Sequence, residues 1–437
     1  MVRKIPVWLL LMALLALVSG CATNPVTGRN ELAFYQMSEG QEIDLGQKAF
    51  PKAIQQMKGE YHDPVLAAYL TGVGNKLAAV SHRPHLPYQF KVVNDSTPNA
   101  FALPGGPIAI TRGLLIGIEN EAQLAAVLGH EVGHVTARHA AQGVQRGLLL
   151  NLGLVILSEA TADVSYSAVA RQAGEAAAVI IDSSYSREQE SESDRLGIDY
   201  MVRAGYDPQG AVQLQEFFLK QSGARDPLWI EGLFRTHPFS RDRMVANQYY
   251  ISSRYPMTRN NAEYVLGKEG FQAATAGLRK TGKAYALYDQ GKEAEREGKL
   301  DRAVDLYRQA VAAASEQGVL QAALGLGLLQ KKDIVQARVH LEKALALDNA
   351  YYESHLGMGY ILLQQNDLNG AISELRHSMN LLPTLEGAFF LAEAYERTGD
   401  LRRAASLYQQ VAVADPKGRT GKTAADRLRF LTGGRPF

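Results

Sequence analysis

The C-terminal part of the chain repeats itself with a period of 33 or 34 residues. Small residues recur at spacings of 34, 34 and 33, at Ala303, Ala337, Ala371 and Ala404. Four residues after each comes a large side chain, at Tyr307, Leu341, Leu375 and Tyr408. Twelve residues before each comes another small residue, at Gly291, Gly325, Gly359 and Ala392. Small side chains let two helices approach closely, so the period predicts stacked helix pairs.

This pattern of small and large positions resembles the tetratricopeptide repeat. The resemblance implies an α-solenoid over residues 275–431, with four units and a closing helix from Thr423 to Leu431. A generic helical bundle is the alternative, but it does not account for equal spacings in several columns. Such solenoids usually present a concave face to other proteins, so we expect this part to bind substrates or a partner.

The first twenty residues have the layout of an export signal. Arg3 and Lys4 precede an apolar run, 5–18, that is shorter than the roughly 20 residues of a membrane span. Small residues follow, and Val18-Ser19-Gly20-Cys21 resembles the lipobox of bacterial lipoproteins. We therefore expect residues 1–20 to be a lipoprotein signal peptide, Cys21 to carry the lipid, and residues 21–50 to form a tether. An ordinary cleaved signal with an incidental cysteine is the alternative.

The residue after Cys21 is Ala22 rather than aspartate, which by resemblance to enteric lipoproteins favours the outer membrane. The predicted location is the periplasm of a Gram-negative bacterium, with the lipid as the only membrane anchor. Lys and Arg number 46 and Asp and Glu 45, so no broad positive charge suggests nucleic-acid binding.

The segment from His130 to His134 reads His-Glu-Val-Gly-His, within a helical pattern from Asn120 to about Gln145. Residues four apart share a helix face, so both imidazoles can bind one Zn²⁺, which accepts neutral imidazole nitrogens. Glu131 stands one position round, where its carboxylate can take a proton from water. This spacing is the HExxH pattern of zinc metallopeptidases. A surface helix with two solvated histidines is the alternative, and its apolar flanks count against it.

Catalytic zinc needs a third protein ligand. A second helical segment begins at Ser186, and on it Glu190 and Asp194 lie four residues apart on one face. We interpret Glu190 as the third ligand and Asp194 as the group that orients a ligating imidazole. The alternative for Glu190 is a solvated run of charge, and Glu188 and Glu192 are expected to point elsewhere.

Two further residues follow the second histidine. On a continuous helix Arg138 would share the face of Glu131 and could neutralise nearby carboxylates. On the same helix His139 would lie about 140° round from His134 and could not share its metal.

With Arg138 and His139, the HExxH segment resembles the signature of peptidase family M48. The segment from Ser186 to Asp194 resembles the second motif of that family, although Ser193 stands where alanine is usual. The resemblance implies a mainly α protein: an α+β zincin-type peptidase domain, 51–270, with a small sheet and an active-site helix, followed by the solenoid. It also implies that Phe101, Ala102 and Leu103 form an edge strand to which a substrate can add.

Thr236-His237-Pro238 resembles a late motif in periplasmic members of the family. Three roles stay open for His237: stabilising the oxyanion, holding the fourth zinc position and thereby blocking the enzyme, or none. The segment from Ala168 to Ile181 is expected to cover and gate the cleft.

The expected activity is zinc-dependent hydrolysis of peptide bonds in unfolded or misassembled outer-membrane proteins. The main alternative is a periplasmic chaperone or assembly factor that docks through its repeats on an outer-membrane assembly machine, with a latent or structural zinc site. A prenyl-protein or small-peptide peptidase is a weaker one. The presence of Glu131 favours the enzyme, because a structural zinc site needs no base.

Overall fold

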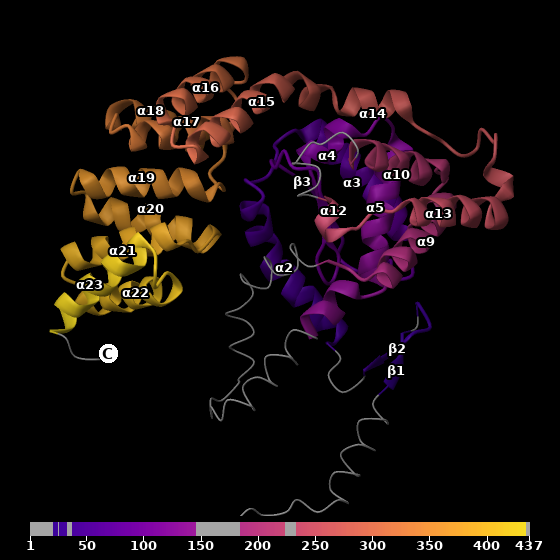
Figure 1. Ribbon diagram of the computed structural model, residues 1–437, viewed down its shortest axis with the longest axis horizontal. Helices are drawn as coiled ribbons and strands as arrows, with labels where there is room; N and C mark the ends of the chain where they lie inside the picture. The colour runs from indigo at the N-terminus through magenta and orange to yellow at the C-terminus, as the bar shows by residue number, and fades with distance from the viewer. Residues whose placement is uncertain (1–20, 25, 33–36, 146–183, 223–232, 434–437) are drawn as a thin grey trace, which may run out of the picture. The chain divides into compact units, whose positions relative to one another are not determined.

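The computed structural model describes residues 21–24, 26–32, 37–145, 184–222 and 233–433 (Figure 1). The expected signal peptide, 1–20, and the expected gate, 168–181, lie outside these residues. Contacts divide the chain into two compact units. The first holds the residues up to Phe50, His62–Val92 and Thr97–Thr275, and the second holds Pro51–Tyr61, Val93–Ser96 and Ala276–Phe437.

The expected tether, 21–50, contains regular structure. Strands β1 (Cys21–Thr23) and β2 (Asn30–Leu32) pair antiparallel. Helix α2 (Glu39–Gln56) then begins with Ser38 and Gln41 bonded reciprocally, side chain to backbone nitrogen. Among the described residues, no helix combines the length and apolar character needed to cross a bilayer.

The first unit is built around a three-stranded sheet and a buried helix. The sheet has the order β3-β5-β4, with β3 (Gln89–Val93), β5 (Pro107–Thr111) and β4 (Ala100–Ala102). Strands β4 and β5 pair antiparallel through a turn that contains Gly105 at φ +78. A Cβ there would lie 2.5 Å from the Ile43 backbone, so the turn also needs glycine for space.

Helix α5 (Glu121–Thr136) is buried along almost its whole length. Asn120 caps it by accepting from the Gln123 amide at 2.9 Å, and the Gln123 side chain accepts from the Glu119 amide at 2.6 Å. Helices α3 (Pro64–Ala79), α9 (Arg187–Arg203) and α10 (Gln209–Ser222) pack against it. The unit also contains α4 (Arg112–Gly117), α12 (Leu233–Thr236), α13 (Arg241–Arg254), the 3-10 helix η2 (Pro256–Thr258) and α14 (Lys268–Ala274).

The expected continuous helix from Asn120 to Gln145 is wrong. Helix α5 ends at Thr136, and a separate helical segment covers 139–145. Arg138 between them has a left-handed backbone, φ +63, which turns the chain. Its guanidinium contacts the Met37 carbonyl oxygen and the Glu42 carboxylate, so it does not lie on the face of Glu131.

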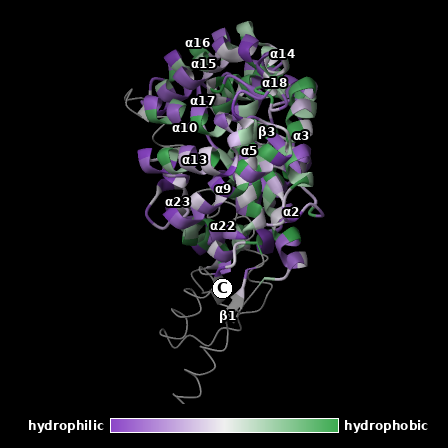
Figure 2. Cartoon of the chain, turned by 90° about the vertical axis from the view of Figure 1, so that its right-hand side faces the viewer, coloured by the Kyte–Doolittle hydropathy of each residue, from purple (hydrophilic) through white to green (hydrophobic). Residues whose placement is uncertain are grey.

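The second unit is a run of antiparallel helices. Their bounds are α15 (Ala276–Arg296), α16 (Leu300–Ala313), α17 (Gly318–Gln330), α18 (Ile334–Leu347), α19 (Tyr352–Gln364), α20 (Leu368–Leu381), α21 (Leu385–Arg397), α22 (Leu401–Ala414) and α23 (Arg419–Thr432). Figure 2 shows both hydrophobic and hydrophilic residues along these helices, as expected where one face is buried.

The repeated positions of the sequence meet inside this unit. The four periodic alanines are fully buried. A Cβ on Gly291 would lie 2.4 Å from the Tyr307 ring, and one on Gly325 would lie 2.7 Å from Leu341. The small and large columns therefore pack against each other within each helix pair, as predicted. Residues 51–61 and 93–96 belong to the same unit, where Gln55 donates to the Ala350 carbonyl at 2.6 Å.

Candidate metal centre

Four side chains converge in the first unit. The Nε2 atoms of His130 and His134 on α5 lie 3.0 Å apart. The Glu190 carboxylate on α9 approaches them at 3.6 and 3.4 Å. Nδ1 of His237, directly after α12, lies 3.3 Å from His130 Nε2 and 3.0 Å from Glu190 Oε1. One donor atom from each residue lies within 4.8 Å of the others, so the structure brings the three expected ligands together with His237.

The two helices that carry the ligands touch through their backbones. A Cβ on Gly133 would lie 2.9 Å from the Ser193 carbonyl oxygen, and a Cβ on Gly197 would lie 2.8 Å from the His130 nitrogen. Ser186 caps α9 in a capping box with Gln189, so Glu190 falls in the first turn. Glycine at the crossing and a fixed helix start together place Glu190 opposite both imidazoles.

Asp194 and Arg243 orient His130. His130 Nδ1 lies 3.0 Å from Asp194 Oδ1, and Arg243 binds both oxygens of Asp194, at 2.9 and 2.7 Å. Burial opposes ionisation, but Arg243 and His130 outweigh it and hold the pKa of Asp194 below its usual range. The ionised carboxylate accepts the Nδ1 proton of His130, which leaves the Nε2 lone pair facing the cluster. Arg243 lies far along the sequence, and no spacing pointed to it.

His139 and Glu192 orient His134. The Nδ1 atoms of His134 and His139 lie 2.9 Å apart, and His139 Nε2 lies 3.0 Å from Glu192 Oε2. Because the carboxylate accepts the Nε2 proton of His139, His139 Nδ1 accepts the Nδ1 proton of His134. His134 Nε2 is then free to bind a metal. Glu192 is not among the four clustered side chains, but it reaches the site through His139, because the turn at Arg138 carries His139 back under His134.

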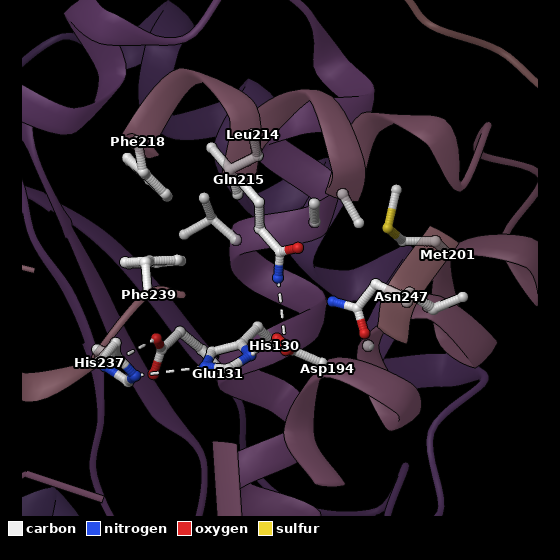
Figure 3. A pocket seen from close by; sticks show the side chains of 15 residues that line it. His130, Glu131, Asp194, Met201, Leu214, Gln215, Phe218, His237, Phe239 and Asn247 are labelled. Carbon is white, nitrogen blue, oxygen red and sulfur yellow. Dashed lines mark hydrogen bonds and ion pairs between the residues drawn. The ribbon is translucent and has the colours of Figure 1, made fainter. Parts of the chain in front are cut away.

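Glu131 lies beside the cluster without joining it. Its Oε1 is 3.5 Å from His237 Nε2, and among the described residues its buried Oε2 has no hydrogen-bond partner (Figure 3). Burial raises the pKa of Glu131, although His237 and His130 counteract it. A buried carboxylate with a raised pKa and a free oxygen suits a general base.

The protonation states of His134 and Glu190 also suit metal binding. Burial lowers the pKa of His134, which favours the neutral imidazole that metals bind. The pKa of Glu190 is lowered by His237, His130 and His134 despite its burial. For His237 burial alone would lower the pKa, but Glu190 and Glu131 raise it. The neutral imidazole of His134 and the ionised carboxylate of Glu190, with Nε2 of His130 beside them, are a donor set for a divalent transition metal.

The expected substrate strand lies at the sheet edge but is covered. Strand β4 is an outer strand, and Phe101, Ala102 and Leu103 are 5%, 1% and 0% exposed. Thr236, the neighbour of His237, lies 3.5 Å from Asn99, directly before β4. A peptide can therefore add to this edge only after a covering segment moves.

Comparisons with known proteins agree with both units. The sequence profile of peptidase family M48 matches residues 64–251, and tetratricopeptide-repeat profiles match 328–383 and 388–420. The beta-barrel assembly-enhancing protease of Escherichia coli K12 is 28% identical over 387 residues, which are 85% of this chain and 73% of the relative.

Two relatives outside bacteria match a shorter part of the chain. The mitochondrial metalloendopeptidase OMA1 of Arabidopsis thaliana is 32% identical over 44% of this chain and 38% of its own length. The OMA1 of Schizosaccharomyces pombe is 30% identical over 46% of this chain and 60% of its own length. The range that matches the peptidase profile contains all four clustered side chains.

Proposed function

We propose that the chain is a metallopeptidase of family M48 with C-terminal tetratricopeptide repeats, and that it uses zinc to hydrolyse peptide bonds in unfolded or misassembled proteins of the bacterial envelope. One observation carries the proposal. Glu131, whose buried Oε2 has no hydrogen-bond partner among the residues that the structure describes, stands beside three donors of the type that zinc prefers, His130, His134 and Glu190.

His130, His134 and Glu190 would hold the zinc, with Asp194 and His139 fixing the two imidazoles. A zinc ion held there would supply Lewis acidity toward a peptide carbonyl and would lower the pKa of a bound water to about 7. Glu131 accepts the proton of the attacking water and returns it to the leaving amine. Because burial raises the pKa of Glu131, this carboxylate holds the proton between the two transfers better than an exposed carboxylate would.

We propose that His237 blocks the centre in this state. Its Nδ1 occupies the space between His130 and Glu190, and its Nε2 approaches Glu131, so no room is left there for a substrate carbonyl. Together with the covered β4, this supports a closed enzyme in which His237 withdraws when substrate adds to β4. The same observations favour a second candidate function, an assembly factor whose peptidase centre is latent.

The second unit offers a groove for an unfolded segment. A cavity of about 520 Å³ lies on α17, α19 and α21, with Leu326, Tyr360 and Phe390 among its apolar lining. Glu353 and Glu386 line it too, so it suits segments in which Lys or Arg alternates with apolar residues. We propose that this groove captures substrates and also docks the protein on the outer-membrane assembly machinery.

The relative's name and the lipobox-like residues before Cys21 support a periplasmic location with a lipid anchor in the outer membrane. Labelling with a fatty-acid analogue tests the anchor. Cys21→Ala should abolish the label, and labelling that persists in this variant would sink the assignment.

Casein cleavage by the chain without residues 1–21, beside Glu131→Gln and with metal content measured, tests the activity. Both forms should bind one zinc, and only the first should cleave. If both bind zinc and neither cleaves, even after His237→Ala, the assembly-factor function replaces this one.

A further inference from the structure

A small cavity adjoins the metal centre (Figure 3). It has a volume of about 40 Å³ and lies among α5, α9, α10 and α13. Its wall is largely apolar, with Val127, Met201, Leu214, Phe218 and Phe239. His130, Glu131 and His237 line it as well, so it adjoins the atoms proposed to do the chemistry.

Two amide side chains bring unused hydrogen-bonding atoms to this apolar wall. Gln215 and Asn247 are both 4% exposed, and within the described part of the chain Gln215 Oε1 and Asn247 Nδ2 have no partner. Gln215 Nε2 lies 3.4 Å from Asp194 Oδ2, which fixes its orientation, because a flipped amide would face oxygen to oxygen. The two amides therefore bring one unpaired acceptor and one unpaired donor to the cavity wall, and leaving such buried atoms unpaired is unfavourable.

We propose that this cavity is a subsite for one substrate side chain next to the cleaved bond, and that it selects a small uncharged side chain with both a donor and an acceptor, asparagine first and threonine second. The proposal rests on the peptidase function proposed above. A purely apolar pocket would not prefer asparagine or threonine over apolar side chains of similar shape.

The size of the cavity and the charges that line it limit which substrate side chains it can accept. A water needs roughly 10–15 Å³ of such volume, so about 40 Å³ accommodates three or four non-hydrogen atoms. An asparagine amide fits, donating to Gln215 Oε1 and accepting from Asn247 Nδ2. Leucine of similar shape leaves both atoms unpaired. Aspartate would bring a charge toward Glu131 and Asp194, which line the same cavity.

The test uses the zinc-loaded chain without residues 1–21 and peptides carrying Asn, Leu, Thr or Val at each position around the cleaved bond. At one position, kcat/KM should favour Asn over Leu and Thr over Val by about tenfold or more. Asn247→Leu should remove this preference at that position alone. Gln248→Leu, the exposed neighbour on α13, should keep it. Equal rates for polar and apolar members would overturn the proposal and indicate that water fills the cavity.

A binding measurement separates this proposal from the peptidase function. Calorimetry on zinc-loaded Glu131→Gln compares peptides that differ only in Asn against Leu. Tighter binding of the Asn peptide, with or without turnover by the unmutated chain, supports the subsite. Equal affinity, or no binding of either peptide at millimolar concentration, overturns it.

Discussion

Arg243 binds both carboxylate oxygens of Asp194, at 2.9 and 2.7 Å, and through them fixes the imidazole of His130. The arginine comes from α13 and the aspartate from α9, so the orientation of one expected metal ligand depends on a helix that contributes no ligand itself.

Arg243→Lys should weaken zinc binding while the chain still folds. Lysine keeps the charge but cannot reproduce the two-pronged contact, so Asp194 and His130 lose their fixed orientation. We expect about 10- to 100-fold lower zinc affinity, measured by competition with a chelator. Arg241→Lys, exposed on the same helix, is the control and should not change it. Equal affinity in all three proteins would contradict the orienting role.

Glu192→Gln should disturb the orientation of the second ligating imidazole, that of His134. A glutamine amide can donate to His139 as well as accept, so the proton arrangement that frees His134 Nε2 is no longer enforced. Zinc affinity should fall about tenfold. Glu188→Gln, exposed on the same helix, should leave it unchanged. If the two variants behave alike, His139 has only a packing role.

His237→Ala decides between two roles for this residue. If His237 blocks the centre, its removal should raise casein cleavage several-fold without changing zinc content. If it stabilises the oxyanion, cleavage should instead fall by about 100-fold or more. The measurement is the initial rate at equal zinc loading.

His355 should give the repeat unit a pH-dependent stability. Its Nδ1 lies 2.6 Å from Glu374 and its Nε2 2.8 Å from the Asn349 carbonyl oxygen. Burial alone would lower the pKa of His355, but these partners raise it. The stabilisation is therefore complete below the unfolded pKa of about 6.5 and is lost as the pH rises through the higher folded pKa.

The melting temperature should thus drop more in His355→Gln at pH 5.5 than at pH 8.5. His340 provides the opposite case, because burial lowers its pKa, and His340→Gln should cost more at pH 8.5. Identical pH trends for the two variants would show that neither histidine is linked to folding as described.

Glu386→Lys should weaken capture of basic unfolded segments by the repeat groove. The substitution reverses a charge on the groove lining, so affinity for a Lys-rich unfolded peptide should fall several-fold, most clearly at low salt. Cleavage of a short peptide should not change. Glu342→Lys, exposed and outside the groove lining, is the control for net charge.

The sequence was most informative where one local rule decides the outcome. The mainly helical fold with a small sheet and terminal repeats is confirmed, because the spacing of residues such as Gly325 and Leu341 directly reports helix packing. The pairing of His130 and His134 likewise follows from helical spacing, whereas Glu190 reaches them from α9 through the tertiary crossing at Gly133 and Gly197. Arg243 and His139 escaped prediction for physical reasons. Arg243 reaches the site only through tertiary packing, and the place of His139 depends on the left-handed turn at Arg138.

The backbone contact between α5 and α9 restricts how this enzyme can open. Gly133 packs against Ser193 and Gly197 packs against His130, so the two helices touch through their backbones. This close packing fixes the distances among the donor atoms that the two helices carry. Of the four clustered side chains, only that of His237 comes from outside these two helices, from the short stretch between α12 and α13. A substrate can therefore be admitted by moving the segment that carries His237 while α5 and α9 keep their places. As a result, mutations can change the free energy of opening without changing the affinity for the metal.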